Sequence, residues 1–235
     1  MRPEQAAMSD PHWLAVLARV LAEEGAQAGA EGEHPSVLAC EGLADPLAWC
    51  GLHAWYADVV VPLLGDALAD QRPALDRLQS LHRRAALGVY GGRGEWRAAL
   101  APVLQPLYRR AYAYEAAYAQ AYQSALHYAA ATANAESLAE DFDSAESFAR
   151  YYAHLSTEAN AGAFASAHAA ATLELAASAF AQRDGDAYAA IASAMARVCV
   201  CACAREPAQR LLLYQHLAAG LLGCLTLSIR PRNTT

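Results

Sequence analysis

Tyrosine recurs at helical spacing between residues 108 and 128, and this run is the most distinctive chemical feature of the sequence. Tyr114, Tyr118 and Tyr122 are four residues apart, and residues at this spacing lie on one side of an α-helix. A tyrosine side chain has an apolar ring and a polar tip, which suits a surface that is wet at its edge. We therefore expect a wide tyrosine-rich face, reaching Tyr128, that binds a ligand or a partner. The alternative is a core helix whose tyrosine hydroxyls reach solvent or the backbone.

Other side chains that could take part in binding lie on or near this face. Glu115 and His127 project from the same arc of the helix, where a buried carboxylate would accept hydrogen bonds from tyrosine hydroxyls. His168 lies in the segment 159–181, which is small or apolar around nearly its whole circumference. Such a helix is expected to be central and buried. The predicted ligand-binding residues are Tyr114, Glu115, Tyr118, Tyr122, His127 and His168.

A histidine and several carboxylates further along the chain have spacings that could serve a metal ion. His154 and Glu158 are four residues apart, at the margin of a stripe formed by Phe148, Tyr151, Tyr152 and Leu155. An imidazole and a carboxylate at this spacing can reach one metal, and the acidic segment 136–146 adds oxygen donors of the kind that Mg²⁺ or Ca²⁺ prefers. The candidate metal ligands are Glu140, Asp143, His154 and Glu158. The alternative is structural, because Asp143 or Ser144 could cap the next helix.

The elements that must position these residues are helices. The 235 residues include 60 alanines and 30 leucines but only 2 isoleucines and 10 valines. Alanine and leucine favour helices, whereas parallel sheets need runs of valine and isoleucine. We predict an all-α fold: one domain over 1–235, a bundle of about eight helices with long central Ala/Tyr-rich helices. Flexible tails are expected at 1–10 and 230–235.

Proline and glycine indicate where these helices end. Residues 107–206 contain no proline, and Gly162 is the only glycine between Glu95 and Asp184, so the longest helices are expected there. Bends are expected at Pro62, Pro102 and Pro106, and an interruption at Gly162. Because leucine and tryptophan concentrate towards the two ends of the chain, we expect these segments to wrap an Ala/aromatic centre. The predicted helices cover 11–27, 36–44, 46–70, 73–88, 95–133, 144–182, 186–205 and 207–229.

The charge is unevenly distributed along the chain. The net charge is −7, which disfavours a nucleic-acid partner. Residues 72–110 carry eight arginines against two acidic residues, whereas residues 111–182 carry eight acidic residues against one arginine. We expect these two blocks to face each other or to be solvated.

Cysteine usage and the N-terminal segment predict a cytoplasmic protein. The sequence has six cysteines and no stretch near Met1 that resembles a signal peptide, so reduced thiols packed as small hydrophobes are expected. The apolar run Leu211–Ile229 would span about 28 Å as a helix. Its glutamine and histidine favour a buried core helix, with a membrane anchor as the alternative. We therefore do not expect a membrane partner.

No complete catalytic motif is present, since the sequence has no P-loop, dinucleotide fingerprint or nucleophile elbow. We predict a non-catalytic binding protein that needs no cofactor and holds a small organic molecule or a partner protein helix against the Tyr-rich face. The alternative is an enzyme with a carboxylate/histidine site in the bundle, with or without a metal. A wide Tyr/Ala face would also allow a homo-oligomer.

Overall fold

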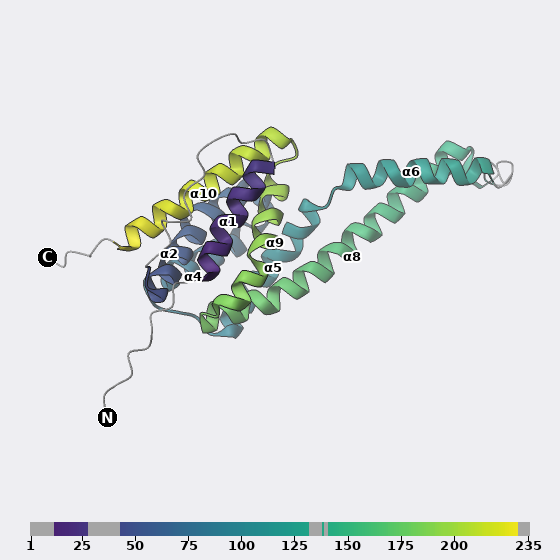
Figure 1. Cartoon of the computed structure of the whole chain (residues 1–235). Coiled ribbons are helices and arrows are strands. Elements are labelled where there is room, and N and C mark those ends of the chain that lie inside the picture. The colour runs from purple at the N-terminus through teal and green to yellow at the C-terminus, as the bar shows by residue number, and fades with distance from the viewer. Residues whose placement is uncertain (1–11, 28–42, 132–137, 139–140, 230–235) are drawn as a thin grey trace, which may run out of the picture. The chain divides into compact units, whose positions relative to one another are not determined.

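The computed structural model describes residues 12–27, 43–131, 138 and 141–229 (Figure 1). Every regular element in these ranges is a helix, which confirms the all-α class. The predicted helix at 36–44, as far as residue 42, and the tails 1–10 and 230–235 lie outside the described residues. The helices are α1 (His12–Gln27), α2 (Asp45–Trp55), α3 (Val61–Ala67), α4 (Arg72–Ala86), α5 (Arg93–Ala111), α6 (Tyr114–Ala131), α8 (Ala145–Gln182), α9 (Gly185–Cys203) and α10 (Pro207–Ile229).

These helices form two compact units. Unit 1 combines Met1–Ala111 with Ala169–Thr235, and unit 2 is the segment Tyr112–His168. Helix α8 therefore contributes its first part to unit 2 and its last turns to unit 1. The sequence indicated one domain and no boundary at either of these positions. All of the predicted ligand-binding and metal-binding residues belong to unit 2.

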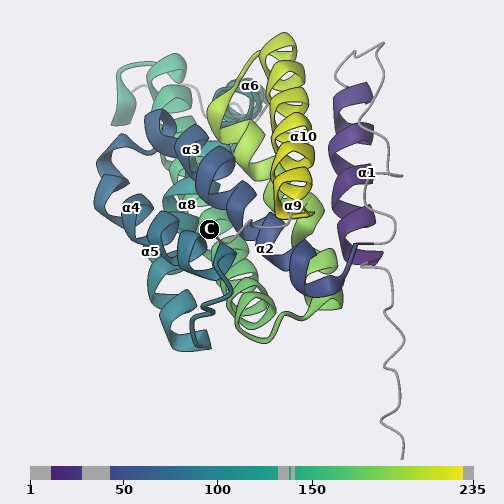
Figure 2. The same ribbon diagram turned by 90° about the vertical axis from the view of Figure 1, so that its left-hand side faces the viewer.

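Unit 1 has a core of large side chains. Trp49, Trp96, Phe180 and Tyr188 are fully buried, as are leucines of α1, α2, α4 and α10. The ring centroids of Trp13 and Trp49 are 4.5 Å apart, and those of Trp96 and Phe180 are 4.9 Å apart. Figure 2 shows α10 running beside α1 and α2, which it contacts. Burying one such side chain contributes about 1.5–3 kcal/mol, so this aromatic and leucine core is the main source of stability in unit 1.

Unit 2 has a core of small side chains instead. On α8 its buried residues recur every four residues from Ala149 to Ala165. Alanine lets two helices approach closely but buries little apolar area. The prediction of Leu- and Trp-rich segments wrapped around an Ala/aromatic centre therefore fails for unit 2, where the Ala/Tyr helices pack on each other. It holds in unit 1 for the end of α8 and for α9, where Ala177, Phe180 and Tyr188 are fully buried. The buried residues of unit 2 are Ala125, Ala129, Ala149, Ala153, Thr157, Ala161 and Ala165.

Thr157 is the polar member of this alanine stripe. Its side chain is 1 % exposed, and its Oγ1 atom has no hydrogen-bond partner. A buried hydroxyl without a partner costs about 1–3 kcal/mol. We expect Thr157→Val, which keeps the shape and removes the hydroxyl, to raise the free energy of unfolding by about 1 kcal/mol in urea titrations. The matched control is Thr226→Val, because the exposed Thr226 donates to the Leu222 carbonyl at 2.8 Å. An equal gain in both variants would contradict the explanation.

The predicted helix over 46–70 contains a π-helical turn just before Pro62, where a bend was expected. The turn covers Tyr56–Val60, between α2 and α3, and the Val61 N–H donates to the Tyr56 carbonyl five residues back. Proline has no N–H and its ring clashes with the carbonyl four residues before it. The wider turn shifts the hydrogen-bond register just ahead of Pro62. It also leaves Tyr56 buried.

The long helix predicted over 95–133 is in fact two helices, α5 and α6, and it does not break at a proline. Pro102 and Pro106 both lie inside α5, and the break falls at Tyr112–Ala113, where the Tyr114 N–H donates to the Tyr112 carbonyl. This position is the boundary between the two units. The expected interruption at Gly162 is absent, because α8 continues through it. A single glycine weakens a helix by only about 1 kcal/mol.

The sequence predicted that the segment 159–181 of α8 is buried on all sides. In the structure it is buried on one side only. Ala161, Ala165 and Ala169 are buried, whereas Ala163 and Ala167 between them are exposed. Alanine is small and is the best helix former, so it occupies exposed positions as readily as buried ones. An apolar circumference made of alanine therefore does not predict burial.

The arginines of α4 and α5 pair largely within unit 1. Arg93 and Arg97 both reach the Glu174 carboxylate, at 2.8 and 3.0 Å, and Arg84 pairs with Glu95. Glu174 belongs to the acidic block of the sequence, so the prediction that the two blocks face each other holds for this residue. These pairs are exposed, and such pairs contribute less than about 1 kcal/mol each.

Candidate functional site

A groove opens on unit 2 between α6 and α8. It has a volume of about 460 Å³, which is within the range of small-molecule pockets and would hold roughly fifteen waters. Helix α6 contributes one wall, and the start of α8 with Leu138 contributes the other. The lining residues are Ser124, Ala125, Tyr128, Leu138, Phe148 and Tyr152.

The groove walls are aromatic and half open to solvent. Tyr128 is 51 % exposed and Tyr152 is 48 % exposed. The Phe148 ring is close to both, with its centroid 6.4 Å from that of Tyr128 and 6.0 Å from that of Tyr152. Phe142 packs edge-on against Phe148 at 5.3 Å and supports it from outside the groove. Aromatic side chains with polar tips at a partly exposed surface are typical of binding sites.

The predicted tyrosine face forms a ladder along α6. The rings of Tyr114, Tyr118 and Tyr122 stack in sequence, with centroids 6.5 and 6.4 Å apart and planes within 15° of parallel. All three side chains are half-buried. The Tyr114 hydroxyl and the Nδ1 atom of His154 on α8 form a hydrogen bond of 3.2 Å. The ladder is therefore tied to α8 at its first member.

The other predicted ligand-binding residues do not gather around one cavity. Glu115 and His127 are exposed on α6. His168 is also exposed, and its ring packs on Phe164 with centroids 4.4 Å apart. None of the six predicted residues lines the groove. What they share is membership of unit 2.

Sequence reasoning placed Tyr128 on the tyrosine face but did not choose it as a site residue. It also noted the stripe that contains Phe148 and Tyr152, and it missed Leu138 altogether. The signal that could have found the groove was the presence of an aromatic stripe on each of two consecutive helices. The pairing of these two stripes depends on how α6 and α8 pack, which neither stripe reveals alone.

The predicted metal ligands do not form a three-residue set in the described part of the chain. There, no group of three or more histidine, cysteine, aspartate or glutamate side chains could hold a metal, and Glu140 lies outside the described residues. Asp143 adopts a left-handed backbone, with φ of 64°. Ser144 caps α8, since its Oγ atom accepts from the Ser147 N–H at 3.1 Å. Of the two residues that could cap the next helix, Asp143 and Ser144, it is therefore Ser144 that does so.

A second cluster of titratable groups lies in the core of unit 1. The Nδ1 atoms of His53 on α2 and His82 on α4 are 3.0 Å apart, so one donates a hydrogen bond to the other. His53 stacks on Trp96 at 5.4 Å, and its Nε2 atom is buried without a partner. Burial lowers the pKa of His53 from 6.5 to about 3. Burial, followed by the nearby His53, lowers the pKa of His82 as well. Both imidazoles are therefore neutral at pH 7.

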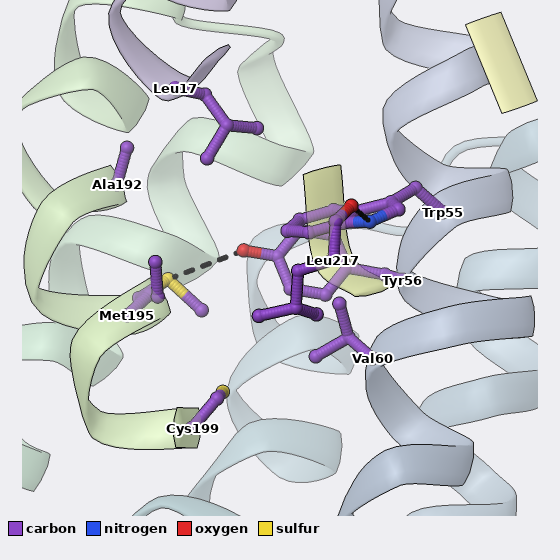
Figure 3. Close-up of a pocket in the computed structure, with 9 residues that line it drawn as sticks. Leu17, Trp55, Tyr56, Val60, Ala192, Met195, Cys199 and Leu217 are labelled. Atoms are coloured by element: carbon purple, nitrogen blue, oxygen red, sulfur yellow. Dashed lines mark hydrogen bonds between the residues drawn. The ribbon is translucent and has the colours of Figure 1, made fainter. Parts of the chain in front are cut away.

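A small cavity next to this cluster shows how closely unit 1 is packed. It has a volume of about 10 Å³, which is room for one water at most. In Figure 3 the Tyr56 hydroxyl points into it and donates to the Met195 sulfur at 3.7 Å, with Leu17 and Cys199 on the far walls. The same hydroxyl is 2.9 Å from that of Tyr188. Burial and then the Tyr188 hydroxyl raise the pKa of Tyr56 well above 10. This region is packed core with no room for a substrate.

Cys199 and Cys203 on α9 are not activated nucleophiles. The five cysteines in the described residues are free thiols, and on α9 burial raises the pKa of Cys199 to about 12 and that of Cys203 to about 11. The thiolate is the reactive form of cysteine. Cys203 instead donates to the Leu63 carbonyl at 3.6 Å, as a packing residue would.

Three helical stretches in the described part of the chain are long and apolar enough to cross a membrane. They are Asp45–Ala67, Gly185–Cys203 and Pro207–Ser228, with 61, 50 and 28 % of their most apolar windows buried in the protein. The last of these is α10, where Tyr214 and Leu217 are buried and Leu212 is exposed. Helix α10 thus packs by one face, while length and composition leave a membrane role open.

Comparison with protein families, with curated proteins and with solved structures finds no match to this chain. The functional argument therefore rests on the geometry of the chain itself.

Proposed function

We propose that this protein is a non-catalytic binding protein that holds an organic ligand or a partner helix in the groove of unit 2. The observation that carries the proposal is the groove itself, with Tyr128, Phe148 and Tyr152 as its walls. Unit 2 buries mostly alanine, while its largest side chains stay exposed or half-buried. An occupant of the groove would bury these rings and add apolar contact that the alanine interface lacks.

The groove has the composition of a binding site more than of a catalytic one. The polar groups among its described lining residues are the hydroxyls of Ser124, Tyr128 and Tyr152, and none of these described lining residues is a histidine, cysteine or carboxylate. General acid–base catalysis most often uses a histidine or a carboxylate within hydrogen-bond reach of the reacting atoms. Tyrosine and serine hydroxyls can donate and accept hydrogen bonds and so can orient a bound molecule. We therefore favour binding over the carboxylate/histidine enzyme considered from the sequence.

Dye binding by groove variants is the experiment that tests the proposal. Nile red, a neutral apolar dye, is expected to bind the 235-residue chain and to gain fluorescence. Tyr128→Ser and Tyr152→Ser should each weaken its binding about tenfold or more, since buried aromatic contacts dominate binding energies. Serine and tyrosine have similar helix propensities, so the helices should persist, which circular dichroism checks.

Tyr151→Ser is the matched control for these variants. Tyr151 is as exposed as Tyr152 and lies next to it on α8, but it does not line the groove. It should leave dye binding within about twofold of the wild type. Equal losses in Tyr151→Ser and Tyr152→Ser, or no loss in either, would rule out the groove as the binding site.

A further inference from the structure

The segment that carries the groove is strongly acidic. Unit 2 has seven carboxylates in its sequence against one arginine, Arg150. Among its described residues, Glu115, Asp141, Asp143 and Glu146 are exposed. Three of these lie within seven residues of Phe148 in the chain, on the side that leads into α8. Unit 2, which carries the groove, therefore has a net negative charge.

This charge selects among the occupants that an apolar groove could accept. A second copy of the chain would bring an equally acidic unit, and like charges oppose such pairing. An anionic lipid surface attracts basic segments and repels acidic ones. A cationic partner, in contrast, is attracted to unit 2.

The shape of the site favours a helix as that partner. Two helices form the walls, and a third helix can lay an apolar stripe between them in the manner of helix-in-groove recognition. Such a stripe needs apolar anchors at positions i, i+3 or i+4, and i+7. Lysine or arginine on the remaining positions would then face the carboxylates of unit 2.

We propose that the groove binds a basic amphipathic helix of a partner protein, an inference that rests on the proposed function of the groove. The leucine-type anchors of that helix contact Tyr128, Phe148 and Tyr152. Its basic flanks interact with the carboxylates near the start of α8, Asp141 and Glu146 among them. The aromatic walls supply affinity and the negative charge of unit 2 supplies selectivity.

Two model peptides test this inference on the full chain. Both have about 18 residues, or five helical turns, and the same leucine stripe, but one carries lysine and the other glutamate elsewhere. Fluorescence anisotropy should show the basic peptide binding at least tenfold more tightly than the acidic one. Raising the salt from 50 to 300 mM should narrow that difference, because salt screens exposed charges.

Variants of the protein separate the contribution of the aromatic walls from that of the carboxylates. Tyr152→Ser should weaken binding of the basic peptide about tenfold, while Asp141→Arg with Glu146→Arg should weaken it severalfold and leave Nile red binding unchanged. Asp186→Arg, an exposed charge reversal in unit 1, is the matched control and should have little effect.

The outcomes distinguish failure of the inference from failure of the proposed function. Equal binding of the two peptides would overturn the basic partner and leave the groove as a binding site. Binding of Nile red but of neither peptide would overturn the proposal of a partner helix and favour an organic ligand. If the protein forms concentration-dependent dimers that Tyr152→Ser abolishes, the occupant of the groove is a second copy of the chain. If it binds phosphatidylcholine vesicles and Tyr152→Ser abolishes that binding, the occupant is a membrane. Loss of all groove binding would overturn both proposals.

Discussion

Acidification from pH 7 to pH 4 is expected to destabilise this protein by about 3 kcal/mol through His53 alone, with a further loss through His82. The pKa of His53 is 6.5 in the unfolded chain and about 3 in the folded core. Between pH 6.5 and pH 3 His53 is protonated in the unfolded state but not in the folded state. Its contribution to the free energy of unfolding is therefore fully present above pH 6.5 and is lost as the pH falls towards 3. Each pH unit across that window removes about 1.4 kcal/mol.

The geometry of the core explains why the two histidines stay unprotonated in the folded state. His53 and His82 face each other through their Nδ1 atoms, with the rings of Tyr56, Trp96 and Phe180 packed around them. The groups facing the pair are aromatic, and the nearest titratable neighbours, Tyr56 and Tyr90, are neutral phenols whose pKa values are raised. Among the described residues, no carboxylate forms a hydrogen bond or an ion pair with either imidazole. A proton on either ring would therefore be a buried charge without a counter-ion.

Urea titrations at pH 7 and at pH 4 measure this effect. Carboxylates elsewhere also titrate in that range, so the informative quantity is the difference between variants. Replacing both histidines by leucine should reduce the loss on acidification by about 3 kcal/mol or more. His216→Gln, an exposed change on α10, should leave the loss as in the wild type. If the double variant does not fold, the histidine NMR resonances of the wild type give the answer, because two of them should stay in the neutral form at pH 5.

Truncation of Trp96 is expected to destabilise the protein by about 3–5 kcal/mol, the usual range for a buried tryptophan replaced by alanine. Trp96 is fully buried, and its ring contacts those of His53, His82 and Phe180. Helix α5 therefore meets α2, α4 and α8 at this one side chain. Removing it leaves a cavity among rigid rings that cannot collapse to fill the space.

Trp96→Phe is the control that separates packing from polarity. The Trp96 Nε1 atom is buried without a hydrogen-bond partner, so phenylalanine keeps most of the ring and removes an unpaired donor. We expect it to destabilise the protein by less than about 2 kcal/mol. A loss as large as that of Trp96→Ala would contradict the view that ring contacts are what Trp96 contributes. Both variants are compared by urea unfolding at pH 7.

Parts of the candidate site followed from the sequence because they depend on one helix only. The four-residue spacing of Tyr114, Tyr118 and Tyr122 predicts rings on one side of a helix, and the rings stack as that spacing requires. The cap at Ser144 is equally local, because its hydroxyl reaches an N–H three residues ahead. The groove did not follow, since Tyr128 and Phe148 come from different helices and meet only when these pack.

The sequence by itself determined that this chain is helical and where most of its helices begin and end. Helix propensity, proline and glycine act over a few residues, so their effects can be read from the chain directly. Tertiary structure alone decided which faces are buried. Alanine occupies buried and exposed positions of α8 alike, and His53 and His82, 29 residues apart, become a pair only through the packing of α2 on α4. Burial is a property of two surfaces that meet, and one helix specifies only its own.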